Sequence, residues 1–371
     1  MVNKRVIDSF CEMVSIQSIS KFEGDYHKYL IDIFENLGCN VHEDNTKEKT
    51  NLGGNNLVIT LEGDKYIEPI FFSCHTDTVD ANEKIRPIIK NDIIYSLGDT
   101  ILAADNKAGI AALIEAIIQI KESKLPHGTI EIVLSPGEEI GLIGSKAFDV
   151  SNLKSHYGFV LDSAGKVGAI TLASPTLVKM NIEITGKSAH AGLEPEKGVS
   201  AIMIAANAMS QIPTGRLDSQ TTINFGTIHG GSSTNVVAQK CVVELEIRSI
   251  SHEICMKKVQ EIRKVFEMNA AKNGGRVLVN SEVLCKGYEF NKEDEVVKKA
   301  MKAICQIERQ PKFEIHGGGS DANSFNEKGK EVINLSIGYE KIHTSDEYIP
   351  IEEIEATVKL ILALVQNQVE N

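Results

Sequence analysis

Apolar side chains in the first 174 residues recur at two spacings, which predict helices and strands in alternation. Spacings of three and four residues predict helices at 6–14, 26–37 and 106–120. Short apolar runs predict strands at 56–61, 69–73, 129–135 and 157–161. Because this alternation is typical of a doubly wound sheet, we expect an α/β domain with a mostly parallel sheet.

From residue 175 the pattern changes to longer strands with period two. It predicts a strand at 177–184, a helix at 198–212, strands at 221–228 and 236–247, a helix at 253–272 and a strand at 276–284. The order βαββαβ is typical of an α+β, ferredoxin-like domain. The α/β pattern then resumes with a helix at 293–307, a strand at 331–337 and a helix at 351–365. We therefore expect a discontinuous domain, residues 1–174 and 288–371, with a second domain inserted at 175–287.

Length and composition agree with a folded, two-domain protein. At 371 residues the chain exceeds what one hydrophobic core usually supports. Its 39 basic residues against 51 acidic ones give a net charge of −12, so we expect no nucleic-acid partner. Asp8 and Glu12 interrupt any N-terminal signal pattern, and no stretch is apolar over the length of a membrane span. The seven cysteines show no C-x-x-C spacing, so we expect a reduced cytoplasmic protein with no membrane partner.

Polar residues that could bind a metal begin where the strand at 69–73 ends. Period two puts His75 and Asp77 on the same side of the extended chain. Asp77 could accept the second ring N–H of His75 and so orient that ring. The alternative for this motif alone is a surface loop with a chance histidine. Strand alternation turns Cys74 away from the site, and no nucleophile signature surrounds it.

Acidic residues follow in the same way at two further places. Asp105 stands directly before the helix at 106–120, where a helix N-cap would explain it on its own. Glu138 and Glu139 follow the strand at 129–135. Neighbouring residues point in different directions, so one carboxylate can bind metal while the other acts as general base. For an isolated pair the alternative is an exposed acidic turn, although the flanking glycines favour a close-packed one.

Asp162 and His343 complete the set, since each follows a predicted strand. The carboxyl ends of strands are where α/β sheets build their sites, so we expect these side chains to converge. Several buried carboxylates are costly without positive charge, and two divalent metal ions would supply it. Two imidazoles with shared carboxylates suit zinc, with manganese or cobalt as alternatives. Six other histidines lack such a context and are expected to be exposed or structural: His27, His42, His127, His156, His229 and His252.

Five ordered runs, H-T-D-T, A-A-D-N-K-A-G, G-E-E-I-G, V-L-D-S and I-H-T-S-D-E-Y-I-P, resemble the peptidase-T-like branch of the di-zinc exopeptidase family. The resemblance spans essentially the whole chain, including a lid inserted at the right position. That family includes aminotripeptidases, dipeptidases, carboxypeptidases and acylamino-acid deacylases. The resemblance implies a zinc metallopeptidase whose discontinuous catalytic domain holds two zinc ions per subunit.

The resemblance also implies a role for each residue of the set. It implies that His75, Asp105 and Asp162 bind one zinc, and that Asp105, Glu139 and His343 bind the other. Asp105 would therefore be the bridging carboxylate. Glu138 would be the general base for attack by a metal-bound hydroxide, and Asp77 would orient His75. In the family the peptide bond after the bridging aspartate is often cis, which here joins Asp105 and Asn106.

The run G-K-S-A-H-A-G at 186–192 resembles the segment that carries the family's lid histidine. The resemblance implies that His190 helps to stabilise the oxyanion, a role that the opposite subunit fills in dimeric relatives. A phosphate-binding loop is excluded here, because Asn181 stands where that motif requires glycine.

Four further residues match substrate-binding positions of the family. Asn235 and Arg248 match lid positions, and an arginine is a natural anchor for a substrate carboxylate. An ion pair of Arg248 with Glu246 or Glu244 on the same strand explains it equally well. In H-G-G-G-S-D-A-N at 316–323, Gly319 and Ser320 resemble a loop that lines the substrate pocket. Many relatives have arginine where Asn323 stands, so the way a terminal carboxylate is held stays open.

We therefore expect an exopeptidase that cleaves short peptides, and the resemblance favours aminopeptidase action on tripeptides. An N-acyl-amino-acid deacylase or a carboxypeptidase on the same core is the alternative. A noncatalytic metal- or peptide-binding protein would lack a ligand or the base, and neither is missing. Lid-mediated dimers and monomers both occur in such families, so a homodimer through the lid is one option.

Overall fold

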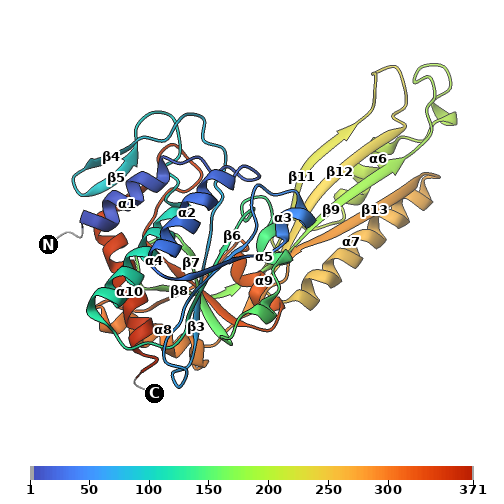
Figure 1. Cartoon of the computed structure of the whole chain (residues 1–371). Coiled ribbons are helices and arrows are strands. Elements are labelled where there is room, and N and C mark those ends of the chain that lie inside the picture. The colour runs from blue at the N-terminus through green and yellow to red at the C-terminus, as the bar shows by residue number, and fades with distance from the viewer. Residues whose placement is uncertain (1–3, 370–371) are drawn as a thin grey trace. The chain divides into compact units, whose positions relative to one another are not determined.

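The computed structural model describes residues 4–369 and divides into two compact units (Figure 1). The first unit contains the described residues up to Leu172, then Phe290–His316, and those from Ser320 onward. The second contains Ala173–Glu289 and the short loop Gly317–Gly319. The expected boundaries at 174/175 and 287/288 lie within two residues of the observed crossings. The sequence pattern does not predict the grouping of the glycine loop with the second unit.

Within residues 4–369, the main sheet has nine strands with a parallel centre. Its principal order is β1 (Asn40–Glu43), β2 (Leu57–Leu61), β6 (Ile130–Ser135), β3 (Ile70–His75), β7 (Tyr157–Ser163), β16 (Glu331–Ser336), β8 (Ala169–Ser174) and β14 (Tyr288–Glu289), and β15 (Lys312–Ile315) also pairs with β8. Strands β6, β3, β7 and β16 run parallel, so their carboxyl ends form one edge. The flanking pairs are antiparallel. The prediction of an α/β fold with a mostly parallel central sheet is confirmed.

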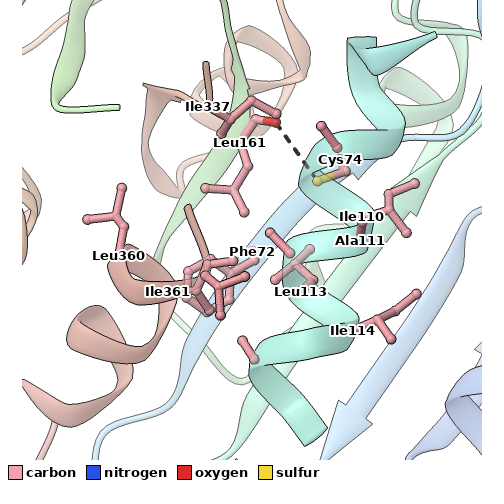
Figure 2. Close-up of a cluster of buried hydrophobic side chains, with 14 of the residues drawn as sticks. Phe72, Cys74, Ile110, Ala111, Leu113, Ile114, Leu161, Ile337, Leu360 and Ile361 are labelled. Atoms are coloured by element: carbon pink, nitrogen blue, oxygen red, sulfur yellow. Dashed lines mark hydrogen bonds between the residues drawn. The ribbon is translucent and has the colours of Figure 1, made fainter. Parts of the chain in front are cut away.

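Helices cover both faces of this sheet, and the alternation of β3 shows why. Phe71 points to one face and packs edge-on against Phe325 of α9 (Asp321–Glu327). Phe72 points to the other face, into the apolar cluster with α4 (Ala104–Ser123) and α10 (Ile351–Gln366) shown in Figure 2. Cys74 has the same parity as Phe72 and lies in that cluster, so the alternation places its thiol as expected.

The remaining helices follow the predicted periodicity closely. They are α1 (Lys4–Val14), α2 (Gly24–Asn36) and α8 (Glu295–Gln306). Helices α1 and α10 both pack against α4, which brings the first and last parts of the described chain together (Figure 1). The short elements α3 (Thr46–Thr50), α5 (Ile143–Ala147) and a small sheet of β4 (Pro87–Lys90), β5 (Ile93–Ser96) and β17 (Tyr348–Pro350) have no counterpart among the predictions.

The second unit, called the lid below, follows the predicted βαββαβ order with one additional two-residue strand, β10. It contains β9 (Thr176–Thr185), α6 (Ala201–Met209), β10 (Gly215–Arg216), β11 (Thr221–Gly230), β12 (Lys240–Ser249), α7 (His252–Lys272) and β13 (Arg276–Cys285). The sheet order is β10-β11-β12-β9-β13, with every neighbouring pair antiparallel.

Two lid elements begin later than the periodicity predicts. Helix α6 starts at Ala201, because Ser200 accepts the Met203 N–H and caps it. Strand β12 starts at Lys240, because Asn235 and Val237 pair with the segment around His190 instead of joining the sheet. Among residues 4–369, no helix is both long and apolar enough to cross a membrane.

Candidate metal centre

The predicted ligands lie at the carboxyl edge of the four parallel strands. His75 is the last residue of β3, Asp162 is near the end of β7, and Glu139 follows β6. His343 follows β16, and Asp105 lies in the first turn of α4. Parallel pairing of β6, β3, β7 and β16 therefore brings together residues that are up to 268 positions apart in the sequence, from His75 to His343.

Asp105 lies between the two imidazoles. Its Oδ1 is 2.9 Å from His75 Nε2, and its Oδ2 is 3.3 Å from His343 Nε2. Each ring has a second carboxylate of its own: Asp162 Oδ1 lies 3.5 Å from His75 Nε2, and Glu139 Oε1 lies 2.8 Å from His343 Nε2. The site thus consists of two groups of side chains that share one carboxylate. The peptide bond between Asp105 and Asn106 is cis, as the resemblance led us to expect.

Asp77 links His75 to the Glu138-Glu139 turn. His75 Nδ1 lies 2.9 Å from the backbone carbonyl oxygen of Asp77 but 3.6 Å from its carboxylate. The carboxylate instead accepts the N–H groups of Glu138 at 2.9 Å and Glu139 at 3.1 Å, and the Ser20 hydroxyl at 2.6 Å. Asp77 therefore contacts His75 through its main chain, while its side chain holds the acidic turn.

Two residues that the sequence analysis did not single out fix Asp162. The Tyr339 hydroxyl donates to Asp162 Oδ1 at 2.9 Å. The Asn334 side chain accepts the Asp162 N–H at 3.0 Å and donates to its carbonyl oxygen at 2.7 Å. Asn334 lies beside Val160 in the β7–β16 register, so strand pairing explains its position. Tyr339 could have been noticed only from its place in the segment that carries His343.

Negative charge accumulates in this site, and burial makes that unfavourable. Burial raises the pKa of Asp162 to about 7, and the charge of Asp105 adds to the effect. Burial also raises the pKa of Glu138 well above its usual range. Hydrogen bonds to Asp105 and Glu139 raise the pKa of His343 to about 10. For His75, burial alone would lower the pKa, but the carboxylates of Asp162 and Asp105 outweigh it and raise the pKa strongly.

The donor set fits divalent cations. Ligand atoms of His75, Asp105 and Glu139 lie within 4.8 Å of one another. Nitrogen and carboxylate donors of this kind suit zinc, manganese and cobalt. A divalent cation would compensate the negative charge of the Asp105, Glu139 and Asp162 carboxylates, so the chemistry of these residues agrees with a metal site.

In the lid, the predicted substrate residues do not form one cluster. The Ala191 N–H donates to the Asn235 carbonyl, so His190 and Asn235 are neighbours. His190 Nδ1 accepts the N–H groups of Gly192 and Leu193, both at 3.2 Å. The segment that carries His190 follows the end of β9 at Thr185, whereas Arg248 pairs with Leu177 near the start of that strand. At the usual rise per residue, Leu177 and Thr185 are roughly 27 Å apart along the strand.

The Arg248 guanidinium is engaged within the lid unit. It donates to both carboxylate oxygens of Glu246, at 3.0 and 3.1 Å, and to the Gly317 carbonyl at 2.7 Å. The ion-pair alternative for Arg248 is thus the arrangement in this structure.

In the loop that follows, Ser320 is buried and caps α9 in a capping box with Asn323. Asn323, the third residue of the helix, accepts the Ser320 N–H at 3.0 Å and so completes this capping box. Gly319, next to Ser320, belongs to the glycine loop that groups with the lid unit.

Comparisons with known proteins agree with this architecture. Residues 56–211 match the model of peptidase family M28, and residues 172–273 match that of the peptidase dimerisation domain. YqjE of Bacillus subtilis (strain 168) is 44% identical over 367 residues, which cover 99% of each chain.

Two solved structures are similar over their full length. The aminopeptidase PepT from Bacillus cereus ATCC 10987 has a TM-score of 0.96 and 43% identity, covering 99% of this chain and 98% of that one. A tripeptidase from Staphylococcus aureus subsp. aureus Mu50 has a TM-score of 0.96 and 37% identity, covering 100% of both chains. With this fold, this set of acidic and imidazole residues and full-length relatives at these identities, the chain belongs to the peptidase-T-like exopeptidase family.

Proposed function

We propose that this protein is a metal-dependent exopeptidase that releases the N-terminal residue of short peptides, with tripeptides as the favoured substrates. The observation that carries the proposal is Asp105, whose two oxygens face two imidazoles that each have a further carboxylate. The aminopeptidase and tripeptidase named above support the choice of substrate. An N-acyl-amino-acid deacylase or a carboxypeptidase on the same core is the alternative.

In this proposal the two ligand groups hold two divalent cations, with zinc favoured by the nitrogen and carboxylate donors. His75, Asp105 and Asp162 would hold one ion, and Asp105, Glu139 and His343 the other. When bound, such ions polarise a carbonyl group and lower the pKa of a water molecule.

Glu138 is the proposed general base. Its carboxylate takes a proton from the attacking water and then delivers it to the leaving amine. Burial raises its pKa well above the usual range, which makes the carboxylate a stronger base than that of an exposed glutamate. The bonds from Asp77 to the N–H groups of Glu138 and Glu139 hold the base next to a ligand of the centre.

The decisive experiment compares wild type with Glu138→Gln, which keeps the shape of the side chain and removes its basicity. We expect kcat to fall by roughly 10²- to 10⁴-fold while metal content is unchanged. Glu131→Gln is the control, because Glu131 is a buried glutamate of the same unit whose carboxylate binds the backbone N–H groups of Lys154 and Ser155. Full activity in Glu138→Gln would refute the assignment of the base.

A substrate panel separates the alternatives. It contains free tripeptides with three different residues and N-acetyl amino acids, and the released residue is identified. Release of the N-terminal residue from the free tripeptides is expected. Turnover of only the N-acetylated compounds would show a deacylase, and release of the C-terminal residue from the tripeptides would show a carboxypeptidase.

We further propose a homodimer through the lid, in which His190 of one copy serves the centre of the other. The match to the peptidase dimerisation domain supports the dimer, while Asn235, Arg248, Gly319 and Ser320 are the proposed substrate contacts. Mixing His190→Ala with Glu138→Gln tests the exchange, because each mixed dimer regains one intact centre. Recovery of about a quarter of wild-type activity is expected from random mixing of two-fold dimers. No recovery from two inactive parents would refute it.

A further inference from the structure

Glu347 is a buried carboxylate whose hydrogen bonds go to the loop in front of Asp105. It is 2% exposed. Its Oε2 accepts the N–H groups of Leu102 at 2.8 Å and Ala103 at 3.0 Å, and its Oε1 accepts the N–H of Asp105 at 3.2 Å. One side chain therefore binds three of four successive residues, the last of which is the shared carboxylate of the centre.

The loop needs such an acceptor because its backbone is irregular. Ala103 has a positive φ of 62°, which is unfavourable for a residue with a Cβ atom. Asp105 and Asn106 have non-helical torsion angles inside the first turn of α4. The N–H groups at the start of a helix have no partner within it, and buried N–H groups without an acceptor are costly. Glu347 supplies the acceptors that stabilise this conformation.

Glu347 also belongs to the segment that carries His343. The Glu347 N–H donates to the Thr344 carbonyl at 3.2 Å, and β17 begins at the next residue. At the start of the same segment, Tyr339 donates to Asp162. Residues 339–347 thus contact Asp162, Glu139 and Asp105 in turn, so one stretch of chain touches both ligand groups.

We propose that Glu347 is a positioning residue that aims the Asp105 carboxylate between His75 and His343, so that both cations can be held together. The inference rests on the proposed metal function of Asp105. Removal of Glu347 frees three N–H groups and lets the loop relax, which moves Asp105 away from at least one imidazole. Metal affinity should then fall before the fold is lost.

The test measures binding of Co²⁺ and Zn²⁺ by calorimetry, and the visible absorption of bound Co²⁺, for Glu347→Ala and Glu347→Gln. Loss of a residue that supports a metal ligand typically costs 10- to 100-fold in affinity, and we expect a loss of that order in Glu347→Ala. Glu347→Gln should lose less, because its amide oxygen still accepts from Leu102 and Ala103 while its NH₂ group faces the Asp105 N–H. A changed Co²⁺ spectrum is expected in both variants.

Glu131→Ala is the matched control, because Glu131 is also 2% exposed and accepts two backbone N–H groups, both at 2.9 Å. It should lose stability without losing metal affinity. Affinity and spectrum in Glu347→Ala equal to those of Glu131→Ala would overturn the inference. If Glu347→Ala does not fold, Glu347→Gln decides, and wild-type affinity with an unchanged spectrum in that variant would overturn it as well.

The proposed function fails in a different way. Wild type would then bind no Co²⁺ or Zn²⁺, or Asp105→Ala would bind as wild type does. A third outcome refutes only the role of Glu347 and leaves the proposed function standing. In that case wild type binds metal, Asp105→Ala does not, and Glu347→Ala binds metal with the affinity and Co²⁺ spectrum of wild type.

Discussion

Acidification from pH 7 to pH 5 is expected to destabilise this protein through His27. The side chain is 3% exposed, and its Nε2 lies 2.7 Å from the Thr76 hydroxyl. Thr76 donates its own proton to the Ser135 carbonyl at 3.2 Å, so His27 Nε2 must be the donor to Thr76. Nδ1 is then an acceptor with no partner among the described residues. Gly54 packs closely against this edge of the ring, since a Cβ on Gly54 would lie only 2.3 Å from Nδ1.

Protonation of His27 would create a buried cation with an N–H that has no acceptor. Burial accordingly lowers the pKa of His27 to about 4. In the unfolded chain a histidine takes up a proton near pH 6.5, so the unfolded state binds more protons between those two values. Stability therefore falls as the pH falls through this window, by about 2 kcal/mol at pH 5 and by at most about 3 kcal/mol below pH 4.

The assay is urea unfolding at pH 7 and pH 5 in the presence of a chelator, which removes any contribution of bound metal. Wild type is compared with His27→Gln, which can still donate to Thr76, and with the exposed-site control His42→Gln. We expect His27→Gln to lose about 2 kcal/mol less than the other two between these pH values. Equal losses in all three proteins would refute the reasoning.

Three further predictions concern the fold and the centre. Gly338→Ala should lower stability by more than about 2 kcal/mol in thermal unfolding, because φ is +101° and the new Cβ would lie 2.1 Å from the Glu353 Cβ. Gly329→Ala is the control: its φ is also positive but the space around it is open, so it should lower stability less. Lys328→Met should cost roughly 2 kcal/mol in urea unfolding, since its ammonium donates to the carbonyls of Ser145, Lys146 and Phe148; a change within error would contradict this. Dialysis against a chelator should abolish peptidase activity and added Zn²⁺ or Co²⁺ should restore it, whereas activity that persists without detectable metal would contradict the proposed centre.

Strong periodicity made the long elements of this chain predictable. Helix α7 and strand β9 lie within a residue of the ranges that the apolar pattern predicts, because each buries a continuous apolar stripe. The small sheet of β4, β5 and β17 was missed, because its strands are only three or four residues long and most of their residues are half-buried, which leaves no clear apolar alternation. Helix α9 was missed for a similar reason, since its seven residues span only two turns.

The sequence by itself determined which side chains can form the centre. His75, Asp105, Glu139, Asp162 and His343 each follow an apolar run or precede a helix, and that order is visible in the chain. It also determined that a second domain interrupts the first, because the period of the apolar residues changes at the insertion.

Only the tertiary structure decided how these residues are supported. In the structure the Asp77 carboxylate accepts hydrogen bonds from the Glu138-Glu139 turn, and Tyr339 donates to Asp162. Glu347 accepts from the loop before Asp105, and Arg248 donates to Glu246. Three of these four carboxylates accept hydrogen bonds from partners distant in the sequence, and most of the donors are backbone N–H groups. Every residue except proline has such a group, so a hydrogen bond to the main chain leaves no mark in the sequence.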